Sequence, residues 1–139
     1  MGGSLWNHWV PYQPDAAVAL QALRDEVFAE RAFYRGKEPD YAEARTIEDA
    51  IRIGAECGTN SVLDIAKGIA AAPRFGASCP LGERQLLALF DTTKPRRAAV
   101  EAERRSLEQM CDRYEAVHLV VYGDDDEPAW LHFVGYSGD

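Results

Sequence analysis

The chain has 139 residues, of which 47% are hydrophobic and 27% charged, and 23 acidic against 15 basic residues give a net charge of −8. This length and composition exclude a disordered chain, a collagen-like repeat and a disulfide scaffold, and they predict a single compact domain over residues 1–139. The acidic balance disfavours nucleic acid and anionic membranes as partners, because binding to phosphate groups needs clustered Lys and Arg.

The first half of the chain predicts a strand followed by two helices. Residues 5–12 are rich in strand-forming side chains, and Pro11 restricts them to a sheet edge or a strand end. A helix is expected from Ala16 to about Phe33, capped by Asp15. Its inward face is marked by apolar residues at steps of three and four, namely Ala16, Leu20, Leu23 and Val27.

Residues 36–45 carry Gly, Pro and charged side chains and predict a surface loop. The next helix is expected to start at Thr46 with a capping box in which Asp49 takes the place of Glu, and to end at Gly58.

The middle of the chain predicts fewer elements. A short strand is possible over 60–65, whereas no element is predicted for 66–80, which are rich in small residues, Gly and Pro. A short helix is expected over 81–90, burying Leu86, Leu89 and Phe90. A long helix capped by Thr93 is expected from Lys94 to about Tyr114, with an apolar stripe at Val100, Leu107, Cys111 and Tyr114.

The end of the chain predicts a β-hairpin. Residues 116–122 and 129–136 are β-branched and aromatic with alternating polarity, and a polar turn separates them. If one face of this ribbon is buried, the odd-numbered residues of one strand must pair with odd-numbered residues of the other. These inward residues would be Val117, Leu119, Val121, Leu131 and Phe133. The opposite face would then hold His118, His132, Tyr122, Trp130 and Tyr136.

The order of these elements predicts an α+β fold. A small, mostly antiparallel sheet would consist of the N-terminal strand and the C-terminal hairpin, covered by about four helices.

Histidine and cysteine supply the candidate catalytic groups. His118 and His132 would lie opposite or diagonal to one another and form an acid–base pair, with His8 as a possible third member. The alternative is that they are packing residues with a polar edge. Cys79 precedes the helix expected over 81–90, where the positive end of the helix dipole would favour a thiolate. No Cys–His signature accompanies it, and the favoured alternative is that Cys79 is structural. Cys57 and Cys111 are interpreted as structural.

Aromatic side chains supply the candidate binding surface. The N-terminal strand and the second face of the hairpin would join into one aromatic platform that lines a pocket or anchors a partner. The alternative is that helices cover both faces of the sheet. The candidate binding residues are Trp6, Trp9, Tyr12, Tyr122, Trp130 and Tyr136.

The turn of the hairpin concentrates negative charge on Asp124, Asp125, Asp126 and Glu127. These residues do not match an EF-hand loop, and no cysteine or histidine spacing fits a zinc site, so neither a metal nor another cofactor is expected. A solvated turn is one interpretation, and steering of a basic partner is the other.

Three stretches resemble a group of small uncharacterised bacterial proteins. They are residues 10–15 (VPYQPD), 58–65 (GTNSVLDI) and 133–139 (FVGYSGD). The likeness spans nearly the whole chain, implies a bacterial source, and brings no activity, cofactor or site residue with it.

Together these observations favour a binding protein over an enzyme, because the sequence carries no recognisable catalytic motif. We expect a small acidic cytoplasmic protein that recognises a basic protein partner, as an inhibitor or immunity-type protein would. The cytoplasmic location rests on three widely spaced cysteines and the lack of a secretory signal. The alternative is a small enzyme or small-molecule-binding domain with an aromatic and histidine pocket on the sheet face.

Overall fold

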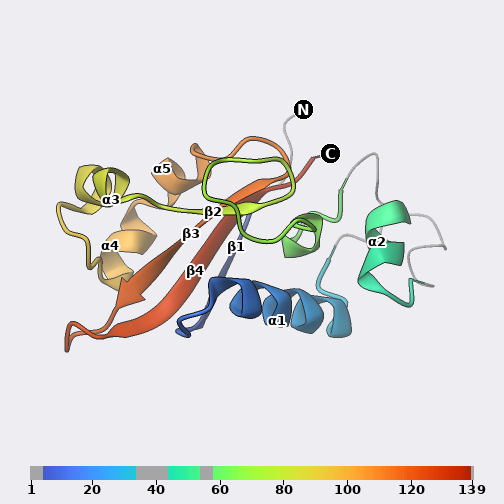
Figure 1. The fold of residues 1–139 in the computed structure, drawn as a ribbon, viewed down its shortest axis with the longest axis horizontal. Coiled ribbons are helices and arrows are strands. Elements are labelled where there is room, and N and C mark those ends of the chain that lie inside the picture. Colours follow the sequence, from blue (N-terminus) through green and yellow to red (C-terminus); the bar gives the residue numbers. More distant parts are fainter. Residues whose placement is uncertain (1–4, 34–43, 54–57, 139) are drawn as a thin grey trace.

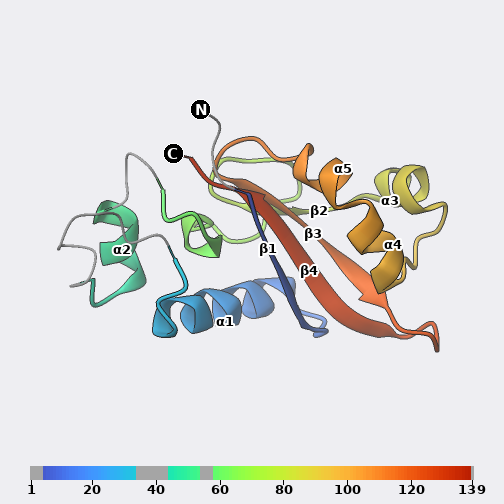
Figure 2. The ribbon, with the colours of Figure 1, turned by 180° about the vertical axis from the view of Figure 1, so that it is seen from behind.

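The computed structural model describes residues 5–33, 44–53 and 58–138. Within these residues, a four-stranded sheet carries helices on both of its faces (Figures 1 and 2). The elements in chain order are β1 (Leu5–Pro11), α1 (Ala16–Ala29), α2 (Ile47–Ile53), the 3-10 turn η2 (Val62–Asp64), β2 (Ser78–Pro80), α3 (Glu83–Phe90), α4 (Arg97–Ala102), α5 (Arg104–Glu108), β3 (Glu115–Tyr122) and β4 (Pro128–Tyr136). The fold is α+β, as the sequence predicts.

The strands follow the order β1-β4-β3-β2 across the sheet. β4 pairs antiparallel with both β1 and β3, which confirms the N-terminal strand and the C-terminal hairpin. β2 pairs parallel with β3, so the sheet is mixed. This short strand lies at the end of residues 66–80, for which no element is predicted.

The predicted register of the hairpin is wrong. Leu119 pairs with His132 and His118 pairs with Phe133, so odd residues of β3 lie on the same face as even residues of β4. The prediction assumed one buried face, whereas both faces of the hairpin pack into a core. When both faces are buried, a slip by one residue moves neither set of side chains into water, and alternation no longer fixes the register.

Two hydrophobic cores lie on the two sides of the sheet. The α1 face packs against α1, α2 and η2, and its sheet residues include Trp6, Val10, Ala116, Leu131 and Phe133. The α4 face packs against α3, α4 and α5, and its sheet residues include Trp9, Val117, Leu119, Val121, Trp130 and Val134. Figure 2 shows α1 on one side of the strands and α4 and α5 on the other.

The first helix starts where the sequence predicts and ends earlier. The Asp15 carboxylate caps α1 by accepting hydrogen bonds from two backbone N–H groups of its first turn. The helix ends at Ala29 rather than near Phe33, because Arg31 adopts a left-handed backbone conformation (φ 54°). The inward face holds Ala19, Leu20, Leu23 and Val27, all buried.

The capping box of α2 forms as predicted. The Asp49 N–H donates to Thr46 Oγ1 (3.1 Å), and the Thr46 N–H donates to Asp49 Oδ2 (3.2 Å). The expected loop over 36–45 falls mainly on residues 34–43, and the expected last turn of the helix falls on residues 54–57, both outside the described part of the chain. Gly58 itself has the left-handed conformation (φ 75°) that is typical of a glycine after a helix end.

Residues 60–65 do not form the possible strand. They form the turn η2, in which Ser61 caps Leu63, and the Asp64 carboxylate accepts hydrogen bonds from the N–H and Oγ1 of Thr59. Such local bonds between side chains and backbone compete with strand pairing, and here they hold the segment in a buried turn.

The single helix expected from Lys94 to Tyr114 is also wrong, and two short helices meet at Glu103 in its place. Before α4, Pro95 accepts a hydrogen bond from the Tyr122 N–H and Arg96 bridges to β3, so Thr93 does not cap the helix. The expected inward residues Val100, Leu107 and Cys111 are nevertheless buried.

The helix expected over 81–90 is confirmed as α3. Its apolar residues Leu86, Leu89 and Phe90 pack against the core but are only half-buried. Asp91, in a left-handed conformation (φ 57°), ends the helix.

Candidate functional site

A cavity opens where the sheet is incomplete. β2 ends at Pro80, which pairs with His118, whereas β3 continues to Tyr122. The outer edge of β3 therefore has no neighbouring strand beyond His118 until Arg96 bridges to Tyr122. The cavity of about 240 Å³ lies along this uncovered edge.

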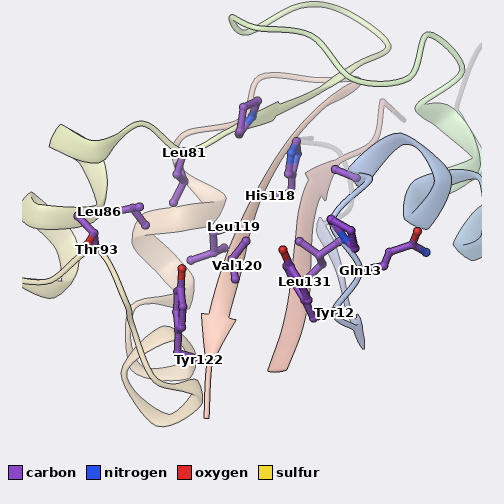
Figure 3. Close-up of a pocket in the computed structure, with 13 residues that line it drawn as sticks. Tyr12, Gln13, Leu81, Leu86, Thr93, His118, Leu119, Val120, Tyr122 and Leu131 are labelled. Atoms are coloured by element: carbon purple, nitrogen blue, oxygen red, sulfur yellow. The ribbon is translucent and has the colours of Figure 1, made fainter. Parts of the chain in front are cut away.

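Residues from five parts of the chain line the cavity (Figure 3). Figure 3 shows Tyr12 and Gln13, which precede α1, on one side of β3, and Leu81 and Leu86 of the α3 side on the other. The lining residues are Tyr12, Gln13, Pro14, Ala16, Pro80, Leu81, Leu86, Thr93, His118, Leu119, Val120, Tyr122 and Leu131. None of them is Asp, Glu, Lys or Arg, so the wall is largely apolar with a few polar groups.

His118 is a buried polar group in this wall, only 5% exposed. Its Nδ1 lies 2.7 Å from the hydroxyl oxygen of Ser78, and burial lowers its pKa to about 4. The Ser78 hydroxyl has no other hydrogen-bond partner in the described part of the chain. We assign the hydroxyl as the donor to Nδ1, because it has no other acceptor among the described residues, and this assignment places the proton of the neutral ring on Nε2.

Ser78 acts on the cavity only through His118. Its side chain is fully buried and does not line the cavity. A serine nucleophile must reach its substrate, so the Ser78–His118 pair is not arranged for nucleophilic attack. Ser78 is a positioning residue that fixes the orientation and protonation of the imidazole.

The predicted histidine pair is wrong. The register places His118 on the α1 face and His132 on the α4 face of the sheet. The His132 Nδ1–H donates to the carbonyl oxygen of His8 (3.0 Å), the ring stacks on Trp9 (3.9 Å between centroids), and burial lowers its pKa to about 4. His132 is therefore a packing residue of the α4 face.

His8 shares the α1 face with His118 but does not touch it. Its partner in the register is Phe133, which in turn pairs with His118, so a phenyl ring separates the two imidazoles. Burial lowers the pKa of His8, and the negative charge of Glu26 opposes that shift. The three histidines do not form one site.

The predicted aromatic platform is also wrong, because its members lie in three places. Tyr12 and Tyr122 line the cavity. Trp6 is buried on the α1 face, where its indole packs over Gly135. On the α4 face, Trp9 and Trp130 meet edge to face (6.2 Å between centroids), and half-buried Tyr136 packs against the same core.

A cation–π contact on the α4 face is absent from the sequence-based expectations. The guanidinium carbon of Arg97 lies 4.3 Å from the ring centre of Trp9 and 5.2 Å from that of Trp130. The same guanidinium donates to Glu101 (3.0 Å), the ion pair expected at that helical spacing. Arg97 thus covers the two indoles.

Cys79 does not match the expectation of an activated thiol. Burial and the nearby charge of Glu115 raise its pKa, which disfavours the thiolate. The residue belongs to β2 rather than to the first turn of α3, so the helix dipole does not offset its burial. Burial likewise raises the pKa of Cys111 to about 12, consistent with a structural residue. Cys57 lies outside the described residues.

The acidic turn is exposed and partly neutralised from within the chain. The Arg96 guanidinium donates to the carbonyl oxygen of Gly123 and to Asp126 Oδ1 (2.8 Å), and it lies 3.7 Å from Asp124. Asp125 accepts a hydrogen bond from the backbone of Glu127 (3.1 Å), as in a local Asx turn.

The described residues contain no group of three or more His, Cys, Asp or Glu placed to hold a metal ion. No helix among them has the length and apolar character needed to span a membrane. Comparisons of the chain with protein-family models, with curated proteins and with solved structures found no match.

Sequence reasoning missed Leu81, Leu86 and Val120 as parts of the cavity wall, and Ser78 as the residue that supports His118. The signal for Ser78 is weak because β2 has only three residues, too few for a periodic pattern. The parallel pairing that brings Ser78 to His118 joins residues forty positions apart. Tyr12, Tyr122 and His118 are the sequence candidates that the structure brings to this cavity.

Proposed function

We propose that this protein binds a small neutral molecule in the cavity at the uncovered edge of β3. The observation that carries the proposal is a buried, neutral imidazole, held by Ser78, in a wall that is otherwise mainly apolar. Ligand sites are typically concave and apolar, with a few polar groups at fixed positions. This arrangement favours the small-molecule alternative that the sequence leaves open.

The volume and polarity of the cavity limit its ligand. The volume of about 240 Å³ lies below the roughly 300–1,000 Å³ typical of ligand pockets, so we expect a ligand smaller than a typical drug. A charged group would lose its hydration here without an opposite charge in the wall. We therefore expect a neutral compound with an apolar body.

The proposed activity is binding rather than covalent catalysis. The Ser78 hydroxyl is buried behind His118, and the pKa of Cys79 is raised, so neither supplies a ready nucleophile. The neutral imidazole supports recognition through a hydrogen bond.

A fragment titration followed by two-dimensional amide NMR spectra tests this proposal. Neutral aromatic and carbonyl fragments are expected to shift the amide signals of Leu81, His118 and Val120. Leu86→Trp fills the cavity from α3 and is expected to abolish these shifts. Leu87→Trp makes the same change at the next, exposed residue of α3 and is expected to retain them. If no neutral fragment shifts the cavity signals, or if both variants behave alike, the proposal is wrong.

Recognition of a basic protein partner is the second candidate function. The exposure of the acidic turn supports it, because Asp124 is fully exposed and the Asp126 side chain is 66% exposed. Arg96 already forms an ion pair with Asp126, which leaves less negative charge for a basic partner.

A charge-matched pair of variants tests this second candidate. Asp124→Asn with Asp125→Asn removes two negative charges from the turn, whereas Glu83→Gln with Glu101→Gln removes two from the helices. A basic protein that co-purifies with the unchanged chain and the helix variant, but not with the turn variant, would support it. Equal capture by both variants, or no capture of a basic protein, would count against it.

A further inference from the structure

The uncovered edge of β3 presents one peptide donor and one peptide acceptor to the cavity. The backbone groups of Ala116 and His118 point towards β2, because the Ala116 N–H donates to Ala77 and the His118 carbonyl accepts from Leu81. Backbone direction alternates along a strand, so those of Val120 point the same way. The Tyr122 N–H, which donates to Pro95, confirms this alternation.

Val120 lies between these two anchored positions and lines the cavity. Its N–H and C=O point away from β4 by the same alternation, and no turn or loop of the described residues bonds to them. An unpaired peptide group that loses its water on ligand binding must find a new partner, or the complex loses stability. A ligand in this cavity is therefore selected for a matching acceptor and donor.

The length of the uncovered edge limits what can pair there. Leu81 closes it at His118 and Pro95 closes it at Tyr122, so only the backbone groups of Val120 remain. An added peptide strand needs a continuous free edge. The gap admits a single donor–acceptor unit instead of a long strand.

We infer that the ligand of this cavity presents an N–H donor and a C=O acceptor side by side on one edge, and pairs with the C=O and N–H of Val120. This inference rests on the proposed function, since it specifies the chemistry of the same ligand. A single trans amide cannot do this, because its N–H and C=O point in opposite directions. The pattern occurs in a ring amide (a lactam), in which the amide is cis, and in one N-acylated amino-acid amide.

His118 lines the same cavity, and with the proton assigned to Nε2 its ring would supply a further donor. It would contact a second acceptor of the ligand, outside the pair formed with Val120. His118 therefore favours ligands that carry an additional acceptor. The N–H of the ligand is required by a different group of the wall, the carbonyl of Val120.

Matched ligands test the inference without changing the fold. 2-Piperidone carries the lactam pattern, and N-methyl-2-piperidone lacks only the N–H. N-acetylalanine N-methylamide carries the amino-acid pattern, formed by its alanine N–H and alanine C=O. N-acetylalanine methyl ester keeps this pair and lacks only the N–H of the N-methylamide group. We expect 2-piperidone, the N-acetylalanine compounds or both to shift the Val120 amide signal. N-methylation of the lactam should weaken its binding about tenfold, because it leaves the Val120 carbonyl without a donor.

The outcomes separate the inference from the proposed function. A shift of Val120 by 2-piperidone alone assigns a ring amide, and a shift by the N-acetylalanine compounds alone assigns an amino-acid unit. Equal binding of 2-piperidone and its N-methyl form, or fragment binding that leaves the Val120 amide signal unchanged, overturns the inference and leaves the proposed function standing. If no neutral fragment binds in the cavity, both fail.

Discussion

The imidazole of His118 shows how one hydrogen-bond partner and burial together define the chemistry of a single side chain. Ser78 donates to Nδ1 and thereby places the proton on Nε2, while burial keeps the ring neutral at physiological pH. His132 reaches the opposite tautomer, because its Nδ1–H donates to the carbonyl oxygen of His8. Two histidines of one hairpin are thus neutral for the same reason and protonated on different nitrogens.

These two pKa values predict how stability depends on pH. The pKa of each ring is about 4 in the folded protein, against 6.5 for the unfolded chain. Above pH 6.5 both states are neutral and pH has no effect through these groups. Between pH 6.5 and 4 the unfolded chain binds the protons first, so the free energy of unfolding falls with falling pH, by up to about 3 kcal/mol per histidine.

Urea unfolding at pH 7, 5.5 and 4.5 measures this loss, and NMR titration assigns it to the two rings. We expect the ring signals of His118 and His132 to remain in the neutral form down to about pH 5. Titration of either ring near pH 6.5 in the folded protein would contradict the burial argument.

Gly135 is a position at which the fold admits no side chain. It pairs with Trp6 on β1, and a Cβ there would overlap the Trp6 indole. We expect Gly135→Ala to reduce the free energy of unfolding by about 1–3 kcal/mol, the usual range for overpacking a core. Gly82→Ala is the matched control, because the nearest atom to its added Cβ is 3.7 Å away. Chemical denaturation of both variants checks the difference, and equal losses would refute it.

The shortness of β2 determines where the candidate site lies. A longer β2 would cover Val120 and close the cavity, whereas three residues are enough to bring Ser78 to His118. Leu119 points its backbone groups towards β4 in a paired position, while those of Val120 point outwards. The two adjacent peptides of one strand therefore have different environments.

Amide hydrogen exchange distinguishes these two peptides. We expect the Leu119 N–H, which is bonded within the sheet, to be protected, and the Val120 N–H to exchange much faster. Exchange is measured residue by residue in deuterated solvent at pH 7, where the histidines are neutral. Equal protection of Leu119 and Val120 would mean that the edge of β3 is covered.

The sequence predicts the elements of this fold better than their relations. The strands of the hairpin, the Asp15 cap and the Thr46–Asp49 capping box depend on local patterns, and all are confirmed. The register depends on which faces are buried, and alternation cannot report that when both are. The site therefore remained hidden, since it depends on the register and on a parallel strand too short to show a pattern.

At the scale of the molecule, the sheet separates two hydrophobic cores. The α1 face holds His118, Val10 and Phe133, and the cavity opens at its end; on the α4 face, Arg97 covers Trp9 and Trp130. Helices cover both faces of the sheet (Figure 1). The aromatic side chains are therefore divided between the two cores rather than gathered on one exposed platform. The candidate site therefore lies at the edge of the sheet rather than on one of its faces.

The net charge of −8 leads to a prediction for the whole chain. The ion pairs that we find on the surface of the described residues, such as Arg97–Glu101, contribute little because they are exposed. Repulsion among the excess acidic groups destabilises the compact state and is screened by salt. We therefore expect the melting temperature at pH 7 to rise when NaCl is raised from about 10 mM to about 150 mM, as the Debye length falls from roughly 30 Å to 8 Å.

Differential scanning calorimetry measures this dependence, and charge variants locate it. Asp124→Asn with Asp125→Asn reduces the net negative charge from −8 to −6 and removes two like charges from one turn, so its melting temperature should depend less on salt. The control, Arg97→Gln, makes the net charge more negative, at −9, and should increase the dependence on salt. A melting temperature that falls with added NaCl would instead show that attraction between ion pairs outweighs the net repulsion.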